Sequence, residues 1–349
     1  MGEVLGGRYE LVDPLGEGGA GVVWRAWDQR EERYVAAKVL RQSDAPTLLR
    51  FVREQAVRVE HPHVLTPLGW AGDDDRVLIA MPLVRGGSVA TLVGDHGPLP
   101  TVWVATLLDQ LLDALARIHG EGLVHRDVKP ANLLLDATGS GLPRLRLADF
   151  GIVTGVDDPR LTHVHHAVGT VGYAAPETLR VGWDPDPRAD LYAAGLSAAE
   201  LLLAQRPDAD TVGPLADLLV RQGVDSGLVA VVLDLAAAEP EERYADASAA
   251  REALRATGLV ASPETWDAGE VEVFDQVPEL PAGWGAAGPE EGQTGPTSRF
   301  GPTDLGPVAQ EATSSTEGGG AGAGSRLGMA LLGLGLLLVL TAGLLALLS

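Results

Sequence analysis

The spacing of apolar residues changes along the chain, and this change constrains the fold more than any other feature of the sequence. Alternating or clustered apolar residues over strand length come first, at residues 8–16, 21–28, 33–40 and 76–84. Helical spacing occurs at residues 45–60, 101–122 and 191–204, and the last of these is apolar on almost every face. We therefore expect an α+β fold in which a small β-rich part precedes a helical part that begins near residue 86.

Length and composition exclude several classes of protein. At 349 residues the chain exceeds the usual size of one hydrophobic core, so we expect two or three units. A net charge of −22 argues against binding to nucleic acid, which needs clustered Lys and Arg. The chain has no cysteine, which excludes disulfides, thiolate metal sites and cysteine nucleophiles. The first residues lack the pattern of a secretory signal, so we expect them to stay in the cytoplasm.

The composition changes after Gly258. Residues 258–325 are rich in Pro, Gly, Ser, Thr and acidic residues, and Arg299 is their one basic residue. We therefore expect a disordered acidic linker over residues 258–325, after a folded domain over about 8–257. Three aromatic residues leave open that part of this linker docks on the domain: Trp266, Phe274 and Trp284.

The C-terminal segment is apolar. Residues 327–348 are 22 positions without a charge, which as a helix would be roughly 33 Å long, enough to cross a hydrocarbon core of roughly 30 Å. We expect a transmembrane helix over 326–349, a single-pass anchor in the cell membrane with the folded domain in the cytoplasm, an orientation that Arg326 weakly supports. Only Ser349 follows the span, so we expect no extracellular domain. Small residues in the span leave open that two copies pair as a homodimer.

A glycine pattern lies between the first two strand-like segments. Gly16, Gly18, Gly21 and Val23 form G-x-G-x-x-G-x-V, and glycines let backbone N–H groups approach phosphate oxygens. The same spacing opens dinucleotide-binding folds, but there the chain enters a helix, whereas residues 21–28 are strand-like. The pattern therefore favours a β-hairpin that covers a bound nucleotide.

A lysine and a glutamate follow this pattern. Lys38 lies near the end of a strand-like segment, where an ammonium is costly to bury unless an anion meets it. Glu54 lies among apolar residues of the next helical segment. An ion pair between the two would hold the ammonium over two phosphates. Either residue alone is also typical of a solvated surface charge, so the inference depends on both.

The stretch LVHRDVKPANLLL, residues 123–135, places polar side chains inside an apolar run. Asp127 can accept a hydroxyl proton, and Lys129 can neutralise charge on a transferring phosphoryl group. Asn132, together with Asp149 in the downstream LADFGIV, offers the oxygen ligands that magnesium prefers. Taken alone, the stretch is equally compatible with a charged turn between two apolar segments.

These motifs, with GTVGYAAPE and the Asp190 of DPRADLYAAG, resemble the eukaryotic-like serine/threonine protein kinase family, and most closely its bacterial membrane-anchored members. The resemblance covers roughly residues 8–257. It implies a bilobal fold with a β-rich N-lobe over about 8–83 and a helical C-lobe over about 84–257. It also implies a signalling enzyme that transfers the γ-phosphate of ATP to Ser and Thr hydroxyls of proteins, with magnesium or manganese.

The resemblance further implies a role for each motif residue. In the catalytic loop it makes Asp127 the catalytic base and Lys129 a residue that steadies the phosphoryl group, with Asn132 and Asp149 as the metal ligands. In the N-lobe it assigns the nucleotide site to Gly16, Gly18, Gly21, Val23, Lys38 and Glu54. It places a hinge after Met81, where the carbonyl of Pro82 and the N–H of Val84 would face adenine.

Regulation is implied by the same resemblance. Lys129 and Thr170 indicate Ser and Thr rather than Tyr as acceptors. Arg126 is typical of members whose activation loop is controlled by phosphorylation, because its guanidinium can pair with a phosphate. Thr162 is the first candidate for autophosphorylation, followed by Thr170 and Thr154; an unmodified exposed Thr is the alternative.

Other polar residues are expected to have structural roles. Glu177 would pair with Arg243, and His125 would pack under the catalytic loop. We interpret Asp13 and Asp28 as turn residues. The histidines of the loop are interpreted as solvated rather than as a metal site: His163, His165 and His166.

One alternative function remains, a pseudokinase that acts as a membrane-anchored nucleotide-binding scaffold. Pseudokinases usually lack the lysine, the base or a metal ligand, and all four are present here: Lys38, Asp127, Asn132 and Asp149. If the chain is anchored, neighbouring copies that pair or crowd at the membrane would phosphorylate each other at Thr162.

Overall fold

The computed structural model of the chain describes residues 2–18, 21–40, 59–73, 76–149, 172–180, 182–206, 213–267 and 269–290. The expected helix at 45–60 lies almost entirely outside these residues, as do the activation-loop threonines and the apolar C-terminal segment.

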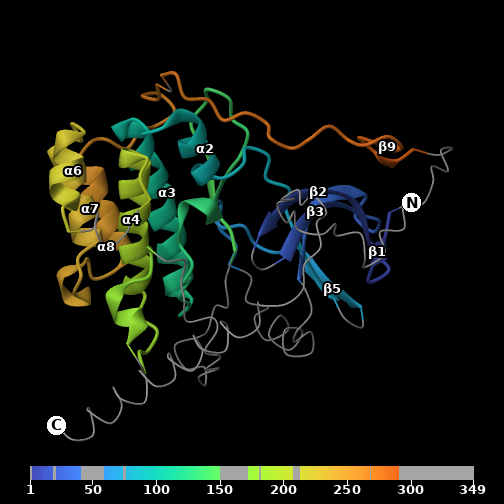
Figure 1. Ribbon diagram of the computed structural model, residues 1–349, viewed down its shortest axis with the longest axis horizontal. Coiled ribbons are helices and arrows are strands. Elements are labelled where there is room, and N and C mark those ends of the chain that lie inside the picture. Colours follow the sequence, from blue (N-terminus) through green and yellow to red (C-terminus); the bar gives the residue numbers. More distant parts are fainter. Residues whose placement is uncertain are drawn as a thin grey trace, which may run out of the picture. The chain divides into compact units, whose positions relative to one another are not determined.

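Six strands form one antiparallel sheet in the order β1-β2-β3-β4-β6-β5 (Figure 1). Their bounds are Val4–Leu5 for β1, Tyr9–Gly18 for β2, Gly21–Asp28 for β3, Arg33–Leu40 for β4, Gly69–Asp73 for β5 and Arg76–Met81 for β6. Alternating apolar residues of these strands meet on one face, where Tyr9, Ala26, Val35 and Ala80 are fully buried. The β-rich part predicted from the sequence is therefore confirmed.

The helical part contains long apolar helices. The described helices are α2 at Val89–His96, α3 at Thr101–Gly120, α4 at Arg188–Leu203, α6 at Leu215–Arg221, α7 at Ser226–Leu235 and α8 at Ala247–Ala256. Side chains cap three of them at their first turns, because Ser88, Asp225 and Asp246 accept hydrogen bonds from backbone N–H groups there. The helices expected at 101–122 and 191–204 are confirmed as α3 and α4.

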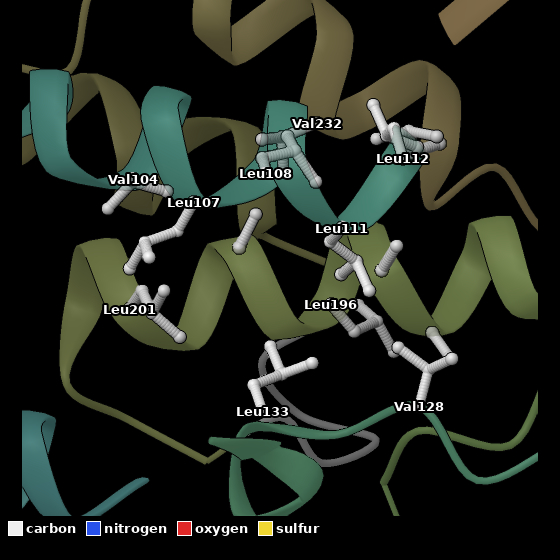
Figure 2. Close-up of a cluster of buried hydrophobic side chains, with 14 of the residues drawn as sticks. Val104, Leu107, Leu108, Leu111, Leu112, Val128, Leu133, Leu196, Leu201 and Val232 are labelled. Atoms are coloured by element: carbon white, nitrogen blue, oxygen red, sulfur yellow. The ribbon is translucent and has the colours of Figure 1, made fainter. Parts of the chain in front are cut away.

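The core of this part lies between α3 and α4. Figure 2 shows Leu107 and Leu111 of α3 facing Leu201 and Leu196 of α4. Val128 and Leu133, from the segment after α3, join the same cluster. Because α4 is covered on nearly every side, its almost uniformly apolar sequence is explained.

A two-stranded hairpin follows α3, and the catalytic-loop motif lies in the segment that leads from α3 into its first strand. It pairs β7, Leu133–Leu135, with β8, Leu145–Leu147, and a short 3₁₀ turn at Pro130–Asn132 precedes it. Backbone hydrogen bonds of 2.9 Å join Leu147 to His63 and to Leu65, in the segment that leads into β5. The hairpin thus holds the end of β8, where Asp149 follows, against residues of the β-rich part.

The segment after α8 packs on the domain as far as residue 290, which corrects the predicted disordered linker for residues 258–290. Trp266 packs edge-on against Trp103 of α3 with ring centroids 4.8 Å apart, and Val271 and Val273 are buried. The chain then runs past the six-stranded sheet to a small hairpin of β9, Trp284–Gly285, and β10, Gly288–Pro289 (Figure 1, orange).

We call residues 271–290 the strap. The acidic composition of residues 258–325 did not predict these contacts, because they are made by a few apolar side chains and by backbone groups. Of the three aromatic candidates, Trp266 and Trp284 make ring contacts, whereas Phe274 is 61% exposed. Residues 291–325 lie outside the described part.

Within the described ranges, no helix combines the length and the apolarity that crossing a bilayer requires. Residues 326–349, where a span is predicted, are outside those ranges, so that span stays a prediction.

Candidate active site

The catalytic-loop motif forms an irregular segment between α3 and β7, and a buried histidine packs against its backbone. His125 is fully buried, its Nε2 lies 3.2 Å from the carbonyl oxygen of Ala148, and its Nδ1 accepts a long hydrogen bond from the N–H of Asp127. Burial lowers the pKa of His125, which keeps the ring neutral. Its predicted structural role under the loop is confirmed.

Asp190, at the start of α4, holds the backbone of this loop. Its carboxylate accepts hydrogen bonds from the N–H groups of His125 and Arg126, at 2.7 and 2.8 Å, and lies 2.9 Å from Nε2 of His119. Burial would raise the pKa of Asp190, but the hydrogen bonds from His119 and the loop lower it. Arg126 has φ of +67°, a conformation that costs energy outside glycine and that these bonds hold in place.

The motif that contains Asp190 did not indicate a role for this residue. The available signal was a carboxylate at the first turn of a helix that is otherwise apolar on almost every face, because a buried carboxylate needs donors.

The predicted base and its neighbours converge. Both carboxylate oxygens of Asp127 lie 2.8 Å from Nζ of Lys129, and one of them accepts a hydrogen bond of 2.8 Å from Nδ2 of Asn132. The same Nδ2 donates to the carbonyl oxygen of Asp127 at 2.7 Å. Three of the predicted residues are therefore brought together, and the orientation of the Asp127 carboxylate is fixed from two sides.

Lys38 and Asp149 form a second pair. Nζ of Lys38, on β4, lies 2.6 Å from Oδ1 of Asp149, which follows β8 with φ of +54°. The lysine side chain is 17% exposed and the aspartate side chain 37% exposed, so the pair lies at the edge of the solvent. It joins the sheet to the helical part. The predicted partner of Lys38, Glu54, lies outside the described residues.

The glycine pattern lies on neighbouring strands beside Lys38. Gly16 and Gly18 are on β2 and Gly21 begins β3, and Val23 is paired with Gly16 on one side and with Lys38 on the other. A Cβ added at Gly21 would lie 2.2 Å from the carbonyl oxygen of Val39, whereas one added at Gly16 would meet nothing within 4 Å. Glycine is therefore required by the fold at position 21, while position 16 is next to open space that phosphate oxygens can approach.

The predicted hinge directly follows β6. Met81 is the last residue of that strand and is buried, and Pro82 and Val84 are half-buried. Val84 packs with Leu134 against a small apolar cluster of Leu65, Met81 and Ala148. This arrangement provides an apolar wall for a flat aromatic group. Leu134 was missed by the sequence analysis because its motif neighbours drew attention to polar side chains only.

The residues present fit a magnesium ion that is shared with phosphates. Nδ2 of Asn132 makes two hydrogen bonds, which leaves the amide oxygen as the atom that can bind a cation, and Asp149 adds a carboxylate. In the described part of the chain no group of three or more His, Cys, Asp and Glu could hold a metal by itself. Magnesium is commonly held by one or two carboxylates together with substrate phosphates, so this donor set suits it.

Several predicted residues lie outside the described ranges. These are Glu54, the activation-loop candidates Thr154, Thr162 and Thr170, and the histidines His163, His165 and His166. Their roles stay predictions.

The predicted pair of Glu177 and Arg243 is confirmed. Two hydrogen bonds of 2.7 and 2.9 Å join the guanidinium to the carboxylate, and both side chains are buried.

Comparison with known proteins agrees with this geometry. Residues 9–222 match the protein kinase domain family. The chain is 38% identical over 220 residues to the serine/threonine-protein kinase PkaA of Streptomyces coelicolor, a match that covers 58% of this chain and 40% of that protein. It is 35% identical over 265 residues to PknL of Mycobacterium tuberculosis, covering 70% and 64%, and 32% identical over 212 residues to PrkC of Bacillus subtilis, covering 59% and 32%. All three are named serine/threonine-protein kinases, and the matches span between about a third and two thirds of their lengths.

Proposed function

Because the chain belongs to the protein kinase domain family, we propose that it transfers the γ-phosphate of ATP to Ser and Thr hydroxyls of proteins. The observation that carries this proposal is the Asp127 carboxylate, oriented by Lys129 and Asn132 at 2.8 Å. The names of the relatives support Ser and Thr as the acceptors.

The residues of the catalytic loop have separate roles in the transfer. Asp127 accepts the proton of the attacking hydroxyl, and Asn132 keeps the carboxylate and the backbone of Asp127 in one arrangement. Lys129, already on the Asp127 carboxylate, donates to the transferring phosphoryl group and offsets its charge.

On the other side of the site, Lys38 binds the α- and β-phosphates under the β2–β3 hairpin. Magnesium, or manganese in its place, would be held by Asn132 and Asp149 and supplies positive charge to the phosphate oxygens. Adenine would pack on the apolar wall beside Val84 and Leu134, and the hinge backbone at Pro82 and Val84 would face its polar edge.

The experiment is phosphate transfer from radiolabelled ATP with magnesium by the full chain and its variants. Asp127→Asn keeps the size of the side chain but removes the base, and it should lower the rate by about 10²–10⁴. Lys38→Ala should remove most activity as well. Asp95→Asn, the same substitution at an exposed position on α2, is the matched control and should leave the rate unchanged.

If wild type binds ATP but transfers no phosphate with either metal, the pseudokinase scaffold replaces this proposal. Mapping the labelled residues of active wild type tests Thr162 first, then Thr170 and Thr154.

We also propose that residues 327–348 anchor the chain in the cell membrane with the kinase domain on the cytoplasmic side. The support is the run of 22 uncharged residues. The full chain should stay with membranes after alkaline extraction, whereas a chain that ends at Ser325 should be released. Release of both would contradict the anchor.

Pairing of anchored copies is a further part of this proposal. Autophosphorylation of the anchored chain should then rise with its density in vesicles. A rate per molecule that is independent of density would contradict the pairing.

A further inference from the structure

The strap contacts the molecule at three successive places, the first of which is in the helical lobe. Val273 is 1% exposed, and its N–H and carbonyl pair with the carbonyl and N–H of Gly139 at 2.9 and 3.0 Å. Val271 is buried beside it. Just upstream, Trp266 donates from Nε1 to the carbonyl of Ser140 at 3.0 Å. This end is therefore held by paired backbone groups and by buried apolar side chains.

The second place is the hinge. The N–H of Gln276 donates to the carbonyl of Arg85 at 2.7 Å, and Asp275 forms an ion pair with the Arg85 side chain. Gly87 has φ of +74°, and a Cβ added there would lie 2.2 Å from Oε1 of Gln276. The Gln276 side chain thus packs directly against the hinge backbone, in space that only a glycine leaves free.

The third place is the β2–β3 hairpin of the N-lobe, where the strap meets a buried arginine. Arg25 of β3 has a side chain that is 4% exposed, and it pairs with Asp13 of β2 through two bonds of 2.7 Å. Its remaining N–H groups donate to the strap carbonyls of Pro278 and Glu279, at 2.9 and 3.0 Å. A buried guanidinium is costly unless its donors are satisfied, so the strap completes this site.

Further contacts continue along the sheet. The hydroxyl of Tyr34 on β4 donates to the carbonyl of Gly285 at 2.7 Å, and the ring of Trp284 lies 6.2 Å from the ring of Tyr34. Gly288 lies so close to Trp27 that a Cβ would be 2.6 Å from the indole. The N-lobe contact is thus spread over both β3 and β4.

The chain between the two lobes sets an upper limit on the distance between its attachment points. Pro278 lies five positions after Val273, so the two attachment points can be separated by at most about 18 Å when the chain is fully extended. A long disordered linker would impose no such limit. Movement of the N-lobe away from the helical lobe beyond this limit must break either the Val273–Gly139 pair or the Arg25 contacts.

We propose that the strap is a built-in tether that limits opening of the two lobes and thereby positions the β2–β3 hairpin for ATP. The proposal rests on the proposed function, because the hairpin is taken to cover the phosphates. Arg25 is a positioning residue in this account: it contacts the strap and β2 and acts on the nucleotide through the hairpin. Without the tether, open arrangements of the lobes become populated. The apparent affinity for ATP is then reduced in proportion to the fraction of molecules that remain closed.

The test lengthens the tether without removing any of its contacts. Insertion of Gly-Gly-Ser-Gly-Gly-Ser between Val277 and Pro278 lies between the hinge and N-lobe contacts and adds about 20 Å of reach. The same insertion between Glu290 and Glu291, beyond the last described contact, is the matched control. Both are made in the full chain.

The first readout is the separation of the lobes, measured without nucleotide or turnover. Because the chain has no cysteine, spin labels can be placed at Arg30→Cys and Val220→Cys, two exposed positions in the N-lobe and the helical lobe. The insertion after Val277 should broaden the distance distribution toward longer values, and the control should match wild type. An unchanged distribution for both would overturn the tether.

The second readout is nucleotide binding and turnover. The insertion after Val277 should raise the Kd and the KM for ATP by about fivefold and leave kcat within about twofold, as expected if only the closed population changes. A broadened distance distribution with unchanged Kd and KM would overturn the positioning role. If wild type transfers no phosphate, the proposed function fails, whereas the distance distribution and the Kd for ATP still decide the tether.

Discussion

Two buried arginines, one in each lobe, have nearly the same surroundings and join very different parts of the chain. Arg243 is paired with Glu177 through two bonds, and it also donates to backbone carbonyls and lies 4.9 Å over the ring of Tyr192. Arg25 is paired with Asp13 through two bonds and also donates to two backbone carbonyls. In both sites a planar guanidinium uses a carboxylate for part of its donors and main-chain oxygens for the rest.

The difference lies in where the carbonyls come from. The carbonyls at Arg243 belong to Ala237, Ala238 and Arg188, all within the helical lobe. Those at Arg25 belong to the strap, 253 and 254 residues away. One site therefore strengthens a single lobe, whereas the other joins the N-lobe to a segment that is also attached to the helical lobe.

The largest effect is expected at the helical-lobe site. Glu177→Ala leaves the guanidinium of Arg243, whose side chain is 0% exposed, without its counter-charge, which should cost about 3–5 kcal/mol of unfolding free energy. Chemical denaturation measures this. Glu241→Ala removes a carboxylate that is 75% exposed and 3.9 Å from Arg188, and it should cost less than about 1 kcal/mol.

Removing both charges sharpens this prediction. Because the penalty comes from the unpaired buried charge, Glu177→Ala combined with Arg243→Met should recover part of the lost stability. If the double variant is less stable than Glu177→Ala alone, the carbonyl contacts of Arg243 and its packing on Tyr192 matter more than its pairing with Glu177.

A smaller effect is expected at the strap site. Asp13→Ala leaves Arg25 with the carbonyls of Pro278 and Glu279, and Asp13 itself is 20% exposed, so the loss should be about 1.5–3 kcal/mol. The same denaturation experiment applies. Glu31→Ala, at a carboxylate that is 47% exposed and 3.9 Å from Arg8, is the control and should be nearly neutral. A loss as large as that of Glu177→Ala would show that the strap carbonyls contribute little.

The two sites also show what could be predicted from the sequence. The pairing of Glu177 with Arg243 was predicted because each residue belongs to a motif that its residue types make recognisable. The same holds for Asp127, Lys129 and Asn132. By contrast, Asp13 was interpreted as a turn residue, although strand pairing places it directly opposite Arg25. That register depends on irregularities in β2, which the apolar pattern does not reveal.

The strap was missed for a second physical reason. Its contacts to Arg25, Tyr34 and Gly139 are made by its backbone groups, which nearly every residue type provides. Composition therefore predicted a disordered linker, and only three aromatic residues left docking open: Trp266, Phe274 and Trp284. The candidate active site was predictable to a greater extent because its chemistry is carried by side chains. Asp190 and Leu134 were the exceptions, since Asp190 acts through hydrogen bonds to the loop backbone and Leu134 through packing.

Acid should lower the stability of the helical lobe more than that of the N-lobe, because the helical lobe contains the fully buried His125. Burial lowers the pKa of His125 in the helical lobe, so the folded state leaves it neutral while the unfolded chain binds a proton below about pH 6.5. Stability should be constant above that pH and fall below it, by at most about 1.4 kcal/mol per pH unit for one proton.

Hydrogen exchange measures where this loss occurs. Exchange of α3 and α4 should accelerate between pH 6.5 and 5.5, after correction for the intrinsic rate, more than exchange of β3 and β4. Burial also lowers the pKa of His61, which lies near Asp113 of α3, so His61→Asn should remove part of the slope and leave the contribution of His125. A pH-independent stability over this range would contradict the neutral, buried state of His125.

The smallest effect is expected at the far end of the strap. Tyr34→Phe removes one hydrogen bond of 2.7 Å to the carbonyl of Gly285 and keeps the ring contact with Trp284, so it should cost about 0.5–1.5 kcal/mol. Tyr244→Phe, which removes a longer bond of 3.3 Å to Asp234, is the matched control and should cost less. Because local opening precedes global unfolding, Tyr34→Phe should also accelerate cleavage after Glu279 and Glu290 by a glutamate-specific protease. Unchanged cleavage would show that the Tyr34 hydroxyl does not hold the strap on the N-lobe.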